Sequence, residues 1–208
     1  MPPSDRKFLR KTFIYGVVIA VVGAALTIAY LFGIFQKRGD IKAEDICRNV
    51  PNRPEVAKVF SSALPEASRY DFEQTWRPDA DWGFRSRCGI RDENDNALFY
   101  LDAKAGPDKS WQEWIKTHIP RNSGGKFDYF NVGLKGIYNS KFAAIWVPCY
   151  AHEKTSKSRY NMTVFADALK PLDASDKEAR EILKDLATDF ARQAHKDAKC
   201  DLPSKLPN

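Results

Sequence analysis

Four cysteines are the residues whose type and spacing point most clearly to a particular chemistry. Cys47, Cys88, Cys149 and Cys200 all follow the same apolar run, and none belongs to a Cys-X-X-Cys pair. An even number of widely spaced cysteines is typical of disulfides in an exported domain, whereas zinc ligands usually come in close pairs. The order along the chain favours the pairs Cys47–Cys88 and Cys149–Cys200. The main alternative nests Cys47–Cys200 around Cys88–Cys149, and four free thiols would indicate a reducing compartment instead.

The residue types that support acid–base or nucleophilic catalysis form no recognisable motif. His118, His152 and His195 are too far apart for a spacing motif, and the sequence has no HExxH, GxSxG, GxGxxG or P-loop pattern. We expect His118 to be a packed residue, because it falls on the apolar face of a helix, and His152 to lie in a polar loop. The sequence therefore nominates no catalytic residue, no metal site and no cofactor.

The acidic and amide residues from Asp92 to Asn96 match the start of a calcium-binding loop. Asp92, Asn94 and Asn96 occupy the first three ligand positions of an EF-hand. Position six is Ala97 instead of glycine and position twelve is Ala103 instead of glutamate, so the sharp turn and the bidentate carboxylate are both missing. We interpret this segment as a solvated hairpin turn.

Two features are candidates for ligand binding. Trp146 points opposite to Ile145 and Val147 in an apolar strand, so we expect it beneath a helix on the second face of a sheet or in a surface groove. The loop 151–160, between two strands, contains three basic residues: Lys154, Lys157 and Arg159. These would suit an anionic contact such as lipid headgroups or a cell-wall polymer, although a basic hairpin tip without a ligand is the simpler interpretation.

An uncharged apolar run extends from Phe13 to Phe35. About 23 helical residues span roughly 35 Å, enough for a hydrocarbon core about 30 Å thick. The run is longer than the apolar region of a signal peptide and continues past the small residues at 25–29, which favours an uncleaved signal anchor over a cleaved signal peptide. Small residues at Gly16, Ala20 and Ala24 recur every four positions, so a homodimer through this helix face is a further hypothesis.

The orientation follows from the flanking charges and the cysteines. The segment 1–12 carries four basic residues against one acidic residue, which accounts for half of the formal net charge of +6. A basic flank is typical of the cytoplasmic side, and the cysteines require the oxidising side. The remaining charge is spread over the rest of the chain, which argues against nucleic acid as a partner.

Periodicity predicts the elements that position these residues. Apolar faces predict helices at 54–64, at 110–119 and from Ser175 through Ala194, the last two starting at capping boxes, Ser110 with Glu113 and Ser175 with Glu178. Period-two alternation predicts strands at 70–76, 82–91, 97–103, 127–132, 142–150 and 160–166. This order predicts an α+β fold, with a single antiparallel-type sheet packed with about three helices and preceded by one transmembrane helix.

The expected domain organisation follows from these elements. It is a cytoplasmic basic tail at 1–12, a transmembrane helix at 13–35, a spacer at 36–43, an extracytoplasmic α+β domain at 44–202 and a C-terminal tail at 203–208.

Several short segments carry a resemblance to a known group of proteins. They are Cys47 before a helix that ends in Leu64-Pro65, the stretch Arg87-Cys88-Gly89, the stretch from Ala144 to Cys149, and the ending Ala198-Lys199-Cys200. Over most of residues 44–200 the pattern resembles small uncharacterised exported proteins of actinobacteria. The resemblance implies a membrane-anchored or secreted protein with a disulfide-bonded α+β ectodomain. Some of these proteins are lipoproteins, but no cysteine ends the apolar run here, so a lipid anchor is not implied.

The leading functional hypothesis is a non-enzymatic ectodomain, held at the outer face of the cell membrane by residues 13–35 in the lipid bilayer. It would bind another protein or a cell-envelope ligand. One alternative is an envelope-associated enzyme whose site is assembled from distant residues. Another is a structural accessory subunit of a membrane complex.

Overall fold

The computed structural model describes residues 38–78, 83–107, 109–118, 126–151 and 160–207, together with Val21, Gly23 and Ala24. The chain divides into two units, residues 1–37 and 38–208, and every element below belongs to the second. The predicted tail 1–12 and nearly all of the predicted transmembrane segment 13–35, including Gly16 and Ala20, lie outside the described residues. Within the described part of the chain, no helix is long and apolar enough to cross a membrane.

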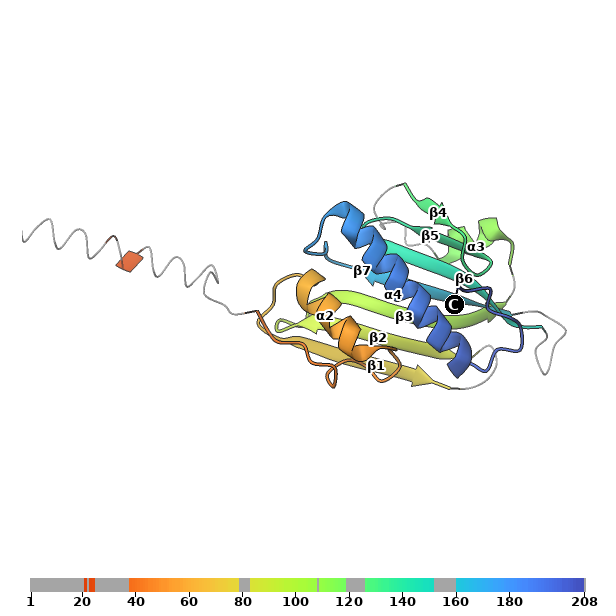
Figure 1. The fold of residues 1–208 in the computed structure, drawn as a ribbon, viewed down its shortest axis with the longest axis horizontal. Coiled ribbons are helices and arrows are strands. Elements are labelled where there is room, and N and C mark those ends of the chain that lie inside the picture. Colours follow the sequence, from red (N-terminus) through yellow and green to blue (C-terminus); the bar gives the residue numbers. More distant parts are fainter. Residues whose placement is uncertain are drawn as a thin grey trace, which may run out of the picture. The chain divides into compact units, whose positions relative to one another are not determined.

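One antiparallel sheet of seven strands forms the centre of the domain (Figure 1). The strands are β1 (Tyr70–Arg77), β2 (Arg85–Asp92), β3 (Ala97–Pro107), β4 (Asp128–Phe130), β5 (Lys135–Tyr138), β6 (Phe142–Tyr150) and β7 (Tyr160–Ala168). Their order across the sheet is β1-β2-β3-β7-β6-β5-β4, so two meanders meet where β3 pairs with β7. The predicted α+β fold with one antiparallel sheet is confirmed.

The helices divide unequally between the two faces of the sheet. Helices α2 (Arg53–Ala63) and α4 (Asp176–Asp197) lie over one face, which Figure 1 shows with α4 running diagonally across the strands. Helix α3 (Trp111–His118) packs on the opposite face. Successive residues of β6 point to opposite faces of the sheet and pack in different hydrophobic clusters. Ala143, Ile145 and Val147 belong to the core under α4, whereas Phe142 and Ala144 belong to the cluster under α3.

Most predicted elements are confirmed within a few residues, including both capping boxes. The prediction missed β5 because this strand has only four residues, and one of them is a glycine, which is rare in strands. Glycine is needed at position 136 because an added Cβ would overlap the ring of Phe130. Strand β4 is shorter than the predicted 127–132, and β3 continues past the predicted end at Ala103 to Pro107.

Both disulfides tie a segment outside the sheet to a strand. Cys47 pairs with Cys88 on β2 at a Cα–Cα distance of 5.8 Å, and Cys149 on β6 pairs with Cys200 after α4 at 4.4 Å. The structure therefore has the sequential pairing that the order of the cysteines favoured, and the nested alternative is wrong.

The folded unit extends beyond the predicted domain boundaries at both ends. In the predicted spacer, Ile41 is buried, and the backbone N–H of Gly39 donates to the carbonyl of Ala67 at 2.8 Å. In the predicted C-terminal tail, the carbonyl of Lys205 accepts the backbone N–H of Gly133 at 3.0 Å. Both segments therefore pack on the domain instead of only leading away from it.

Candidate functional site

Helix α3 covers only part of its face of the sheet. Trp114 anchors it: the side chain is almost fully buried, and its indole N–H donates to the hydroxyl of Thr163 on β7 at 2.9 Å. The residues that pack with Trp114 include Ile137 on β5 and Phe142 on β6. The helix therefore lies over the half of the sheet formed by β5, β6 and β7.

Three tryptophan rings meet beside this helix. Trp111 stacks on Trp114 with ring centroids 4.9 Å apart, and Trp146 on β6 lies 6.0 Å from Trp114 and 6.3 Å from Trp111. Trp146 is on the face opposite Ile145 and Val147, where its position in the alternation places it. Trp111 and Trp146 are half-buried, so part of each indole ring remains accessible to solvent.

A groove of about 500 Å³ borders these two half-buried rings. Its lining consists of Lys109, Ser110, Trp111, Leu134, Trp146, Pro148, Ala151, Asn161, Leu202, Pro203 and Lys205. Small-molecule sites are typically apolar and aromatic with a few polar groups, and this lining has that character. The charged residues that line the described part of the groove are lysines, without a carboxylate. Asp201 lies beside it, but its carboxylate accepts the backbone N–H of Ala151 at 2.8 Å.

The segment that follows Cys200 forms one wall of the groove. The disulfide joins this segment to β6, and the backbone N–H of Leu202 donates to the carbonyl of Cys149 at 3.0 Å. A nitrogen of the His195 ring lies 2.9 Å from the carbonyl of Leu202. Burial lowers the pKa of His195, while its hydrogen bonds oppose that shift. The histidine thus helps to hold the wall.

Gly133 allows the close approach of this wall to β6. Its φ is +59°, and a Cβ added there would lie 2.5 Å from the carbonyl oxygen of Trp146. Because glycine tolerates a positive φ and has no side chain, its backbone N–H can donate to the carbonyl of Lys205. The N–H of the next residue, Leu134, donates to the Trp146 carbonyl at 2.7 Å. A non-glycine residue here would disturb the backbone that carries Trp146.

Lys135 on β5 adds a positive charge next to the tryptophans. Its ammonium lies 5.1 Å from the ring centroid of Trp111 and 5.7 Å from that of Tyr129, distances typical of cation–π contacts. Tyr129 is 62% exposed. The edge of the groove region therefore combines aromatic surface with a cation.

A cavity of about 590 Å³ lies elsewhere, where α2 meets the start of α4. Acidic residues dominate its charged lining, among them Glu178 and Glu181. Glu178 belongs to the capping box of α4, and Glu181 forms an ion pair with Lys184 at 2.7 Å. These carboxylates already have structural partners, so this larger cavity is a weaker candidate than the tryptophan groove.

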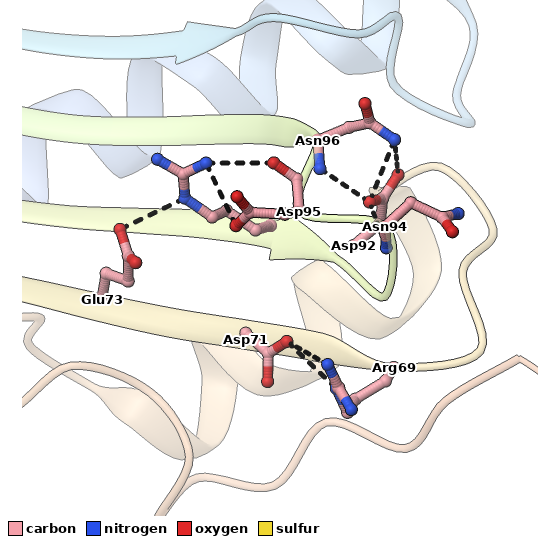
Figure 2. Close-up of polar contacts among 8 residues, drawn as sticks. Arg69, Asp71, Glu73, Asp92, Asn94, Asp95 and Asn96 are labelled. Carbon is pink, nitrogen blue, oxygen red and sulfur yellow. Dashed lines mark hydrogen bonds and ion pairs between the residues drawn. The ribbon is translucent and has the colours of Figure 1, made fainter.

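The predicted hairpin turn at Asp92 is confirmed (Figure 2). A carboxylate oxygen of Asp92 accepts the backbone N–H groups of Asn94 at 2.9 Å and of Asn96 at 2.8 Å, and the other accepts the Asn96 amide at 2.9 Å. Slight burial would raise the pKa of Asp92, but the hydrogen bonds from Asn96 and Asn94 outweigh it and lower that pKa. Arg91 bonds Asp95 and Glu73, so the turn satisfies its own charges.

Three of the predicted binding residues lie outside the described part of the chain: Lys154, Lys157 and Arg159. Their loop follows Ala151, which lines the groove. His152 and the side chain of His118 are also outside the described residues.

Sequence reasoning offered Trp146 as a binding candidate, and it lines the groove; the groove residues from distant segments, chiefly Trp111, Lys109 and Lys205, were not among the candidates. The position of Trp111 in the first turn of a short helix, next to Lys109, was the available signal, and core packing was the default interpretation. Comparison of this chain with protein-family models, with curated proteins and with solved structures finds no significant match.

Proposed function

We propose that this chain is a single-pass membrane protein whose disulfide-bonded ectodomain binds a negatively charged, sugar-containing ligand of the cell envelope. The tryptophan groove would be the binding site. The observation that carries the proposal is the groove itself, which the half-buried indoles of Trp111 and Trp146 line together with Lys109 and Lys205.

The anchoring part of the proposal depends on the chain's composition and cysteine pairing. Residues 13–35 contain no charged side chain over a length that suits a bilayer. Cys47–Cys88 and Cys149–Cys200 are disulfides, and disulfides persist mainly in oxidising compartments. An anchor with its C-terminal side outside the cytoplasm accounts for both observations.

The ligand chemistry follows from the two kinds of side chain in the groove. A pyranose ring has a face of C–H groups that can pack flat on an indole, and the burial of that surface favours association. The lysines supply positive charge, and the described lining has no carboxylate to repel an anion. A ligand that combines sugar rings with negative groups therefore matches both features.

Binding without catalysis is the better-supported interpretation of this site. Enzymes place titratable groups close together where they can exchange protons with a substrate. The described lining holds no histidine, cysteine or carboxylate, and nearby His195 is engaged with the carbonyl of Leu202.

Truncation of Trp146 tests the proposed function. In the full-length protein, reconstituted in nanodiscs of uncharged lipid, we expect Trp146→Ala to weaken binding of uronic-acid oligosaccharides about 30-fold, the effect of a hot-spot aromatic worth about 2 kcal/mol. Trp76→Ala is the matched control. Trp76 is 41% exposed but packs edge-on against Phe84, on the face that α2 and α4 cover.

Circular dichroism would establish that both variants are folded, and Lys205→Gln gives a second groove variant that leaves the tryptophans in place. Equal affinity of Trp146→Ala and Trp76→Ala for the oligosaccharides would contradict the proposed function.

A further inference from the structure

A line of basic residues crosses the sheet towards the tryptophan groove. From β1 to β5, the residues directly opposite one another are Arg77, Arg85, Lys104, Thr163, Trp146 and Lys135. Residues paired in this way point to the same face of a sheet. Trp146 identifies that face as the one on which α3 packs. We call Arg77, Arg85 and Lys104 the basic row.

The basic row lies on the half of this face that α3 leaves uncovered. Arg77 is exposed, the Arg85 side chain is 44% exposed, and Lys104 is half-buried. Arg87, two residues along β2, stacks on the ring of Tyr100 with its guanidinium carbon 3.8 Å from the centroid. Among the described residues, the half of the face that α3 does not cover therefore presents several cations close together.

Structural partners offset part of this charge: the ammonium of Lys104 lies 5.8 Å from the ring centroid of Phe165, and Arg85 pairs with Asp102. Arg77 lies opposite Arg85, and Arg85 lies opposite Lys104, so two successive cross-strand pairs carry like charges. Like charges directly opposite each other destabilise a sheet. Asp102 relieves part of the repulsion, because both of its oxygens accept hydrogen bonds from Arg85, at 2.9 and 3.3 Å. The residual excess of positive charge suits an anionic ligand. Asp79 and Asp81, in the loop after Arg77, lie outside the described residues.

The basic row is continuous with the groove along β3. Trp114 contacts Thr163 in the middle of the line, and the described residue that links Lys104 to the groove is Gly106, two positions further along β3. Gly106 lies opposite Asn161, which lines the groove, and a Cβ added to Gly106 would meet no atom within 4 Å. Lys109, at the groove itself, follows shortly after on the chain.

We propose that the ligand is a linear acidic polysaccharide, with one sugar ring against Trp146 in the groove and the charged groups of the following units along the basic row. This inference rests on the proposed function and specifies its ligand. Four strand spacings separate Trp146 from Arg77, or about 19 Å at about 4.8 Å each, so the polymer must extend over several sugar units. A free sugar or a single headgroup would occupy only the groove.

The test compares short and long ligands of the same chemistry on the full-length protein in nanodiscs of uncharged lipid. The ligands are a trimer and a dodecamer of galacturonate, with the methyl-esterified dodecamer as the uncharged equivalent. We expect the dodecamer to bind about 10-fold more tightly than the trimer, because each additional exposed ion pair contributes a factor of a few. The esterified dodecamer should lose that advantage.

Two variants test separately whether the charge of the basic row and the space at Gly106 are needed for binding of the dodecamer. Arg77→Gln combined with Lys104→Gln should lower the dodecamer affinity to near that of the trimer and reduce its salt dependence, while trimer affinity stays unchanged. Gly106→Leu should have the same selective effect by obstructing the path without changing the charge. Lys58→Gln combined with Lys177→Gln is the matched control, since these exposed lysines lie on α2 and α4, over the opposite face.

Equal affinity for trimer and dodecamer, or an unchanged dodecamer affinity in the Arg77/Lys104 variant, would overturn the inference. If trimer binding still depends on Trp146, the proposed function survives that result. Failure of both oligomers to bind would refute the proposed function as well. Tighter binding to phosphatidylglycerol vesicles or to single-stranded oligothymidylate than to the dodecamer would overturn the assignment to a polysaccharide.

Discussion

Removal of the Cys149–Cys200 disulfide should affect stability and ligand binding together. The bond closes a loop with a sequence separation of 51. In the chain-entropy model, closing such a loop in the unfolded state lowers its entropy by about 14 cal/mol/K, which corresponds to about 4 kcal/mol at about 25 °C. We therefore expect Cys149→Ala combined with Cys200→Ala to lower the free energy of unfolding by about 4 kcal/mol. The same change releases the segment with Leu202 and Lys205, which lines the groove, from its covalent link to β6. The affinity for uronic-acid oligosaccharides should therefore fall at least about 10-fold, because the wall must be ordered when the ligand binds.

The other disulfide is a matched control for this experiment. Cys47–Cys88 has a sequence separation of 41, so its removal should also cost about 4 kcal/mol. Neither of its cysteines lines the groove. The double variant Cys47→Ala, Cys88→Ala should therefore lose stability without losing affinity, when both are measured well below its unfolding midpoint.

Urea unfolding of the full-length protein in detergent, followed by tryptophan fluorescence, measures the stability. All five tryptophans lie after residue 38, so the signal reports on the unit 38–208 alone. If the Cys149/Cys200 variant binds the oligosaccharide with wild-type affinity while folded, the disulfide does not position the groove wall. A stability loss below about 1 kcal/mol in both variants would contradict the chain-entropy estimate.

Two single substitutions give further predictions. Gly133→Ala should lower the free energy of unfolding by at least about 1–2 kcal/mol, because an alanine at φ +59° is strained and its Cβ would overlap the Trp146 carbonyl oxygen. Urea unfolding measures this loss, and an unchanged midpoint would contradict the reasoning. Burial raises the pKa of Asp167 from 3.8 to about 6. The carboxyl of the unfolded chain ionises above about pH 3.8, while that of the folded protein stays protonated up to about pH 6. Stability is therefore greatest below about pH 3.8, decreases as the pH rises from there to about 6, and is level above that. Asp167→Asn should stabilise the protein at about pH 7.5 and change it little at about pH 3, and equal effects at both pH values would refute this assignment.

Local patterns predicted the elements with strong periodicity. The apolar stripe and capping box of α4 and the alternation in β1, β2, β6 and β7 are properties of consecutive residues, so they can be read without knowledge of the fold. Strand β5 was missed because its four residues are too few for a period to emerge. Its place beside β6 is fixed by pairing, which is a tertiary effect.

The site was predictable only in part, for a related reason. Trp146 stands out locally because it interrupts an apolar strand on the face opposite Ile145 and Val147. The groove around it also needs Trp111 from α3 and Lys205 from beyond α4, which meet it only after the chain has folded. The basic row depends on the registers of β1, β2 and β3 and on the insertion of β7 between β3 and β6. Strand order of this kind leaves no signature in a single sequence.

The wall built by Leu202, Pro203 and Lys205 has a consequence for biosynthesis. Ribosomes add these residues after all the others that line the groove, and the covalent link between the wall and β6 forms only when the thiols of Cys149 and Cys200 have joined. A nascent or reduced polypeptide therefore carries the tryptophans with one side of the groove still open. Under the proposed function, the groove would therefore reach its full affinity for the ligand only after synthesis and oxidation are complete.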